Sequence, residues 1–182
     1  MSIAVIINPV AGHARRNRAV ERAHLAAAVI EQAGERAEIF ITERAGHAHD
    51  LAAAAAIGGA RLVVAWGGDG TINEVASALA FRDVPLGIIA AGSGNGLARE
   101  LRIDPRPEHA LAHAMQATPV AVDLGELGGR LFVNAGGTGI DAYVAAEFNA
   151  AGNTRRGFSG YLRIGARAVV SYAPVSDRKS VV

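Results

Sequence analysis

Residues 61–76 read RLVVAWGGDGTINEVA, an apolar run followed at once by three glycines around one aspartate. The run predicts a buried strand over 61–66, and the residues after the glycines predict a helix over 71–81. Glycines this dense are costly to order, because glycine loses more conformational freedom on folding than any other residue. They therefore indicate either a tight turn or the close approach of the backbone to a ligand.

The same alternation of strand and helix runs from the N-terminus to residue 116. Short connections between such elements are typical of right-handed βαβ units and a parallel sheet covered by helices. We therefore expect an α/β fold, with a doubly wound parallel sheet and helices on both faces. The expected strands cover 3–8, 38–42, 61–66 and 85–90, and the expected helices lie within 20–34, 47–56, 71–81, 95–102 and 107–116.

After Pro119 the sequence becomes richer in β-formers and in Gly-Gly pairs, and ELGGRLF at 126–132 predicts a hairpin. We expect a nucleotide-binding α/β domain over 1–122 and the start of a smaller, β-rich second domain over 123–182. A helix is expected over 160–172. The second part is short for an independent hydrophobic core.

Composition excludes several classes of protein. The 182 residues have a net charge of +1 and no cysteine, which excludes disulfides and thiolate metal sites. Neither a nucleic-acid-binding signature nor an apolar run of the roughly 20 residues that span a bilayer is present. The lack of cysteine fits a reducing compartment, so we expect a cytoplasmic protein. Lys179 is the only lysine, so no Walker-type Gly-Lys-Ser/Thr loop exists and phosphate charge must be met by backbone N–H groups, arginines or a metal ion.

Glycine-rich or polar segments follow three of the expected strands: NPVAG at 8–12, GGDGT at 67–71 and GSGN at 92–95. Any one of them alone could be ordinary turn chemistry. Ligands of open α/β sheets bind beyond the carboxyl ends of the strands, where the three segments should converge. Glycine there lets backbone N–H groups approach a phosphate.

Two competing motifs fit the third segment poorly. A dinucleotide-binding G-x-G-x-x-G/A fingerprint would need a glycine or alanine where the chain has Leu97, which weakens that hypothesis. A nucleophile elbow G-x-S-x-G around Ser93 would need glycines where Ala91 and Asn95 stand, so Ser93 is no hydrolase nucleophile.

Taken in order and spacing, NPVAG, GGDGTINEV and AAGSGNGLAREL resemble the catalytic domain of the diacylglycerol kinase and sphingosine kinase family of lipid kinases. TERAGHAHDLA at 42–52 and VDLGELGGRLFVNAGGTGIDAYV at 122–144 extend the resemblance over nearly the whole chain. GGDGT alone is shared with NAD kinases and phosphofructokinases. GSGNGLAREL favours the lipid kinases.

The resemblance implies a kinase that uses ATP and Mg²⁺ to phosphorylate a hydroxyl of diacylglycerol, or of a related lipid or sphingoid base, at a membrane surface. It implies that Glu74 and Asn95 orient the ligand or a loop. The positions that it assigns to the nucleotide are Asn8, Pro9, Gly12, Thr42, Gly67, Gly68, Gly70, Thr71, Asn73, Glu74, Gly92, Ser93, Gly94 and Asn95.

Asp69 is the residue with the most direct chemical role in this interpretation. Its carboxylate could hold Mg²⁺, directly or through water, or accept the proton of the substrate hydroxyl. A purely structural alternative is that Asp69 caps the helix expected to begin near Thr71.

The chain departs from the family in its last part, where the late acidic motif of the second domain is absent. We expect a C-terminally truncated chain that transfers little phosphate and forms homo-oligomers through its incomplete domain. Asp141, Arg155 and Arg156 are candidates for contacting the acceptor or the phosphates. A nucleotide-binding module without turnover and an enzyme like NAD kinase remain as alternative functions.

Overall fold

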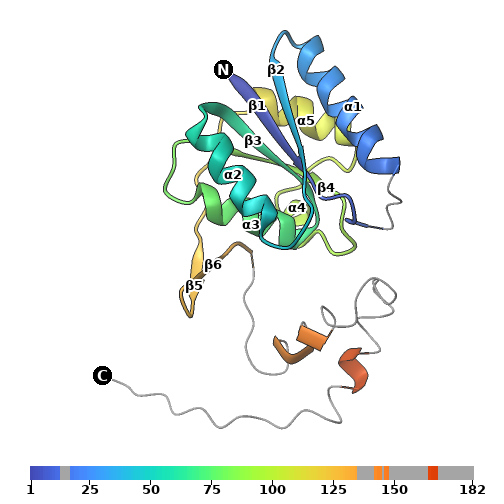
Figure 1. Cartoon of the computed structure of the whole chain (residues 1–182). Helices are drawn as coiled ribbons and strands as arrows, with labels where there is room; N and C mark the ends of the chain where they lie inside the picture. The colour runs from blue at the N-terminus through green and yellow to red at the C-terminus, as the bar shows by residue number, and fades with distance from the viewer. Residues whose placement is uncertain (13–16, 135–141, 145, 148–163, 168–182) are drawn as a thin grey trace. The chain divides into compact units, whose positions relative to one another are not determined.

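The computed structural model describes residues 1–12, 17–134, 142–144, 146–147 and 164–167 (Figure 1). The chain divides into two compact units, Met1–Asn134 and Ala135–Val182. The described residues of the second unit are helical. The domain boundary expected between residues 122 and 123 stays a prediction.

The first unit is built on a parallel sheet with the strand order β2-β1-β3-β4. After β1 the chain crosses to β2 on one side, and it then returns past β1 to β3 and continues to β4. The side of the sheet on which the chain adds strands therefore changes between β1 and β3. In parallel α/β sheets such a switch point leaves a crevice at the carboxyl ends of the two strands, where ligands bind. The strands are β1 (Ser2–Ile7), β2 (Arg36–Ile41), β3 (Ala60–Gly67) and β4 (Leu86–Ala90).

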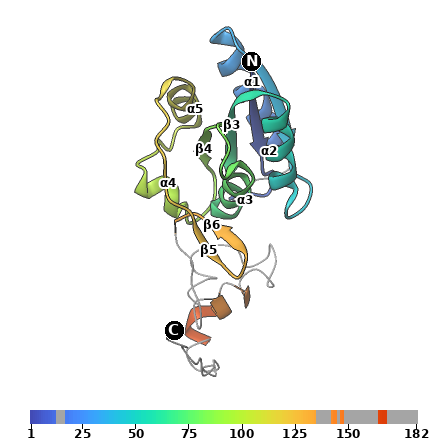
Figure 2. The same ribbon diagram turned by 90° about the vertical axis from the view of Figure 1, so that its left-hand side faces the viewer.

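Helices cover both faces of this sheet, which confirms the predicted doubly wound fold. Figure 2 shows the sheet between the two layers, and each layer buries its own apolar cluster. In β1, Ile3, Val5 and Ile7 face one cluster while Ala4 and Ile6 face the other, so both faces of the strand are buried. Helices α1 (Asn17–Gln32) and α5 (Pro107–Gln116) cover one face, and α2 (His47–Ile57), α3 (Asp69–Leu79) and α4 (Gly96–Glu100) cover the other.

Helix boundaries differ from the expected ones by up to three residues, at both starts and ends. Helix α3 begins at Asp69, two residues before the expected start, because Gly68 occupies the N-cap position. Gly34 ends the region of α1 as expected: its φ is +77°, which glycine adopts without strain, and its N–H donates to the carbonyl of Glu31 over 2.9 Å.

The predicted hairpin is confirmed by the antiparallel strands β5 (Gly125–Leu127) and β6 (Arg130–Phe132). Gly128 and Gly129 form its turn with φ values of +57° and +74°, which explains the Gly-Gly pair. Farther along the stretch noted for its β-formers, residues 142–144 and 146–147 are helical. Of the helix expected over 160–172, residues 164–167 are helical and the others lie outside the described residues.

No helix in the described part of the chain is both long and apolar enough to cross a lipid bilayer.

Candidate active site

The three glycine-rich segments meet at the carboxyl edge of the sheet. The side-chain amide of Asn8 donates a hydrogen bond from Nδ2 to Oγ1 of Thr71 over 2.8 Å, which joins the end of β1 to the start of α3. The Ala91 N–H donates to the carbonyl oxygen of Gly67 over 2.8 Å, and this bond joins the ends of β4 and β3. Thr42 lies beside them, buried, with its N–H bonded to the carbonyl of Ile7 over 2.9 Å.

Three of the glycines are required by close packing at this edge of the sheet. A Cβ atom at Gly92 would lie 2.7 Å from the Cα of Gly68, and one at Gly67 would lie 2.5 Å from the Cβ of Thr71. At Gly12, where φ is +73°, a Cβ would also lie 2.6 Å from the carbonyl oxygen of Ala91. Close contact with backbone atoms at Gly12 and Gly92, and with the Thr71 side chain at Gly67, explains these positions without a ligand.

Gly70 is different. It lies exposed in the first turn of α3, and a Cβ there would meet no protein atom within 4 Å among the described residues. Glycine in a helix costs about 1 kcal/mol relative to alanine. The protein's own contacts do not explain the missing side chain, so the open space at Gly70 is the best candidate for the approach of a ligand.

The first turn of α3 is also the natural anion-binding element of this edge. The N–H groups of Asp69, Gly70 and Thr71 have no acceptor among the described residues, and the helix dipole makes this end positive. The alternative role of Asp69 as a helix cap was wrong. Gly68 is the N-cap residue and makes no side-chain capping bond, while Asp69 already lies within the helix.

The Asp69 carboxylate is exposed and makes no hydrogen bond or ion pair with any described residue. Gly94 of the third segment and Gly96, which directly follows that segment, leave room for it. A Cβ at Gly94 would lie 3.0 Å from Oδ2 of Asp69, and one at Gly96 would lie 3.7 Å from Oδ1. Asp69 is therefore free to bind a metal ion or a substrate hydroxyl.

These residues fit a nucleotide carrying Mg²⁺ better than a metal held by protein alone. The described residues contain no cluster of three or more His, Asp or Glu side chains that could hold an ion. Mg²⁺ usually keeps several waters and is bound through one or two carboxylates together with substrate phosphates. Asp69 beside the N-terminus of α3 matches that arrangement.

Two polar residues expected near the nucleotide use their side chains to hold loops. Both carboxylate oxygens of Glu74 accept backbone N–H groups at the start of α2, from Gly46 over 3.0 Å and from Ala48 over 3.2 Å. Asn95, with φ at +53°, pairs its amide with both the N–H and the carbonyl of Gly92 over 2.8 Å each. Of the two roles predicted for these residues, the contacts fit that of orienting a loop.

Asn73 also faces away from the glycine loops. Its Nδ2 donates to the carbonyl of Leu131 over 3.3 Å, and its Oδ1 accepts the N–H of Val133 over 2.9 Å. Asn73 therefore fastens the β5–β6 hairpin to α3. Of the remaining predicted residues, Pro9 is half-buried directly after Asn8 and Ser93 is exposed. Asp141, Arg155 and Arg156 lie outside the described residues.

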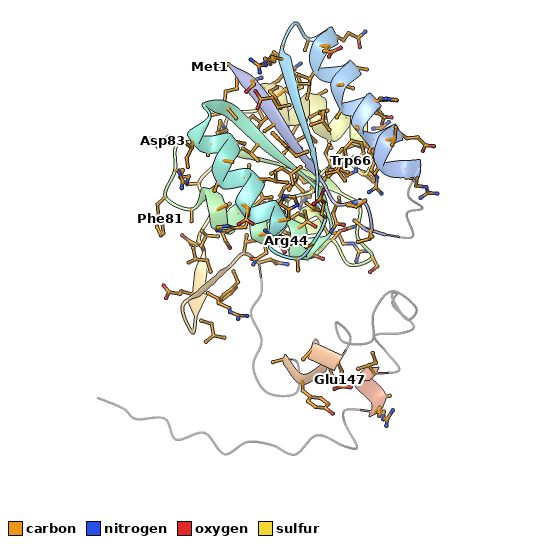
Figure 3. All side chains as sticks on the ribbon, in the orientation of Figure 1. Met1, Arg44, Trp66, Phe81, Asp83 and Glu147 are labelled. Atoms are coloured by element: carbon orange, nitrogen blue, oxygen red, sulfur yellow. The ribbon has the colours of Figure 1, made fainter. Side chains whose placement is uncertain are left out.

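Sequence reasoning missed Arg22, a residue of α1 that is hydrogen-bonded to the first glycine-rich segment. Its guanidinium donates to the carbonyls of Asn8 and Ala11 over 3.2 and 3.3 Å. It also lies 5.8 Å from the ring centroid of Trp66, a residue that is labelled in Figure 3. Burial, and then the charge of Arg18, lower the pKa of Arg22. A hollow of about 310 Å³ beside it is lined by α1, Trp66 and the end of β4.

Sequence reasoning also missed Gly96 and Asn134. A Cβ at Gly96 would lie 2.6 Å from Nδ2 of Asn134, so the end of the hairpin reaches the neighbourhood of Asp69. The signal in the sequence was the third glycine of GSGNG, which the tested fingerprints did not use.

Together these features define an α/β domain with glycine-rich loops and a free helix N-terminus at its switch point, an arrangement suited to binding phosphate groups. The chain belongs to the diacylglycerol kinase catalytic domain family, whose profile matches residues 2–127.

Comparison with individual proteins agrees with this membership. The chain is 38% identical over 112 residues to a Pseudomonas syringae protein named "Probable lipid kinase YegS-like", which covers 60% of this chain and 36% of the relative. It is 38% identical over 141 residues to a diacylglycerol kinase of Bacillus subtilis, which covers 74% and 45%. A crystal structure of a diacylglycerol kinase from Bacillus anthracis superposes with a TM-score of 0.60 at 25% identity, covering 73% of this chain and 48% of that one. The chain thus spans less than half the length of these proteins.

Proposed function

We propose that the protein is an ATP- and Mg²⁺-dependent lipid kinase that transfers the γ-phosphate to a hydroxyl of diacylglycerol or of a related lipid or sphingoid base. Membership of the family supports a lipid kinase in general. The observation that carries the specific proposal is the free carboxylate of Asp69, which lies beside the open side of Gly70 in the first turn of α3.

In this proposal the N–H groups of the first turn of α3 bind the phosphates. Asp69 would hold Mg²⁺, directly or through water, and the ion would supply neutralisation of the phosphate charge. Asp69 accepts the proton of the acceptor hydroxyl. Positioning and charge neutralisation dominate phosphoryl transfer, so the rigid bonding of the loops contributes directly to rate. Glu74 and Asn95 supply that rigidity by fixing the start of α2 and the loop after β4.

The substrate class implies reaction at a membrane surface, so we propose peripheral association of a cytoplasmic enzyme. Self-association of the chain stays a prediction.

The test combines binding with transfer. Trp66 is the only tryptophan, and it immediately precedes Gly67, so its fluorescence should report a nucleotide at the loops. We expect Mg·ATP to change the fluorescence at lower concentration than NAD, and γ-labelled ATP to label, at the low rate expected of this chain, at least one member of a panel of diacylglycerols and sphingoid bases. Preferential binding of NAD would favour an enzyme like NAD kinase. Binding of Mg·ATP with no labelled lipid would favour a module without turnover.

A further inference from the structure

A carboxamide from the hairpin and the carboxylate of Asp69 border the same small space. A Cβ placed on Gly96 would lie 2.6 Å from Nδ2 of Asn134 and 3.7 Å from Oδ1 of Asp69. A side chain at Gly96 would occupy part of this space. Asn134 is exposed, and within the described residues its side chain has no hydrogen-bond partner.

The residues just before Asn134 are bonded to α3, and they fix where Asn134 lies. The bonds from Asn73 to Leu131 and Val133 fasten the chain just before it to α3, and Oγ of Ser77 adds a bond to the carbonyl of Leu131 over 3.4 Å. Asn134 has a φ of +82°, a left-handed conformation that asparagine tolerates better than most residues. Asn134 therefore follows a segment that is hydrogen-bonded to α3, and it lies near the proposed catalytic carboxylate of Asp69.

The two groups have complementary hydrogen-bonding character. An ionised carboxylate only accepts hydrogen bonds, whereas the Nδ2 of asparagine only donates them. A hydroxyl group has one hydrogen to donate and two lone pairs to accept with. A hydroxyl between Asp69 and Asn134 can donate to Oδ1 of Asp69 and accept from Nδ2 of Asn134, and one lone pair then remains free.

We propose that Asn134 binds the acceptor hydroxyl together with Asp69, an inference that rests on the proposed lipid kinase function. The free lone pair of the hydroxyl oxygen forms the new bond to the γ-phosphorus. The bond from that phosphorus to the β,γ-bridging oxygen breaks, its electron pair leaves with ADP, and the hydroxyl proton passes to Asp69. Asn134 fixes the direction of the lone pair and leaves binding of the nucleotide to the glycine loops.

Two variants disturb the amide in different ways. Asn134→Gly removes it while favouring the left-handed backbone. Gly96→Ala keeps it but pushes its flexible end out of the space, because the new methyl group would lie 2.6 Å from Nδ2. Asn134→Asp retains the shape and an oxygen but loses the N–H donor. Glu126→Gln, an exposed change on β5 of the same hairpin, is the control.

For Asn134→Gly, Gly96→Ala and Asn134→Asp we expect the kcat/KM for the lipid acceptor to fall about tenfold or more, the fold-change that corresponds to one hydrogen bond. The titration of Trp66 fluorescence with Mg·ATP and the melting temperature should stay those of the wild type, as should all properties of Glu126→Gln. A structural role of Asn134 would instead lower the melting temperature and weaken ATP binding as well.

Acceptor kinetics within twofold of the wild type for Asn134→Gly or Gly96→Ala would overturn the inference, as would full activity of Asn134→Asp. If the wild-type protein labels no lipid, the proposed function itself fails and the inference falls with it. Transfer by the wild type that is insensitive to all three variants would leave the lipid kinase assignment intact and refute the role of Asn134 alone.

Discussion

Replacing Gly70 with alanine tests whether this glycine leaves space for a ligand, whereas Gly92 is required by packing. A methyl group at Gly70 would meet no atom of the described residues within 4 Å, whereas one at Gly92 would lie 2.7 Å from the Cα of Gly68 and 2.9 Å from Oδ1 of Asn95. The two variants make the same chemical change on facing loops. Gly92→Ala is therefore the matched comparison.

The expected effects on stability have opposite signs. Alanine is favoured over glycine in a helix by up to about 1 kcal/mol, so Gly70→Ala should melt at the wild-type temperature or a few degrees higher, at about 2–4 °C for each kcal/mol. The methyl group of Gly92→Ala needs a separation of about 3.5–4.0 Å from other carbons. Because two backbones must move apart to provide it, we expect a loss of about 1–3 kcal/mol, as in overpacked cores.

For nucleotide binding, unlike for stability, we expect the substitution at Gly70 to be the harmful one. If phosphate oxygens approach α3 over Gly70, its new methyl group occupies their path and the affinity for Mg·ATP should fall about tenfold or more, which corresponds to about 1.4 kcal/mol. Trp66 fluorescence gives the affinity, and thermal unfolding without nucleotide gives the stability. A Gly70→Ala protein that binds Mg·ATP as tightly as the wild type would refute the conclusion that the open side of Gly70 receives a ligand.

Three further substitutions test the supports of the site and of the fold. Glu74→Gln should lower the free energy of unfolding in urea by about 1.5–3 kcal/mol, because an amide group would face one of the two backbone N–H groups that the carboxylate now binds; an unchanged value would contradict the anchoring role. The hydrogen bond from Arg61, helped by its charge, lowers the pKa of Glu35, so the folded state binds fewer protons than the unfolded one. The ion pair should therefore add about 1 kcal/mol or less to the free energy of unfolding above the ordinary glutamate pKa, and this contribution should disappear as the pH falls through the lowered pKa. Urea unfolding of Glu35→Gln at several pH values should lack this pH-dependent contribution. The same pH profile for the variant and the wild type would contradict the pairing. Phe81 is 97% exposed with φ at +60°, so Phe81→Asn should raise the melting temperature by relieving about 1 kcal/mol of backbone strain, and a lower value would show that Phe81 makes a stabilising contact.

The parallel sheet could be predicted from the sequence because its pattern is local. Continuous apolar runs such as 61–66 predict strands buried on both faces, and β3 is buried along nearly its whole length. The Gly-Gly pair at 128–129 likewise predicted a hairpin, since the turn needs left-handed residues. Composition alone did not predict the structure after the hairpin, where 142–144 and 146–147 are helical, because strand formation depends on pairing as well as on β-forming residues.

The site was predictable in its location but less so in the tasks of its residues. Three glycine segments had to meet at the carboxyl edge once the sheet was parallel, and the Asn8–Thr71 bond joins two of them. The pattern could not tell which polar side chains face the ligand. Glu74 and Asn73 stand in the same motif as Asp69, yet they bond to α2 and to the hairpin, because positions along a helix point in different directions. Asn134 could not be predicted as part of the site, because it lies beside Gly96 only in the folded chain and the two residues are far apart in the sequence.

The most direct test of the central claim is transfer of phosphate from γ-labelled ATP to lipid by the wild type and by Asp69→Asn. Asparagine has nearly the same shape, and the Asp69 side chain makes no hydrogen bond with the described residues. The variant should therefore fold with an unchanged melting temperature and still bind Mg·ATP. The account predicts that its rate of lipid labelling falls by about a hundredfold or more, the range for a lost proton acceptor. Labelling by Asp69→Asn at a rate close to that of the wild type would contradict it.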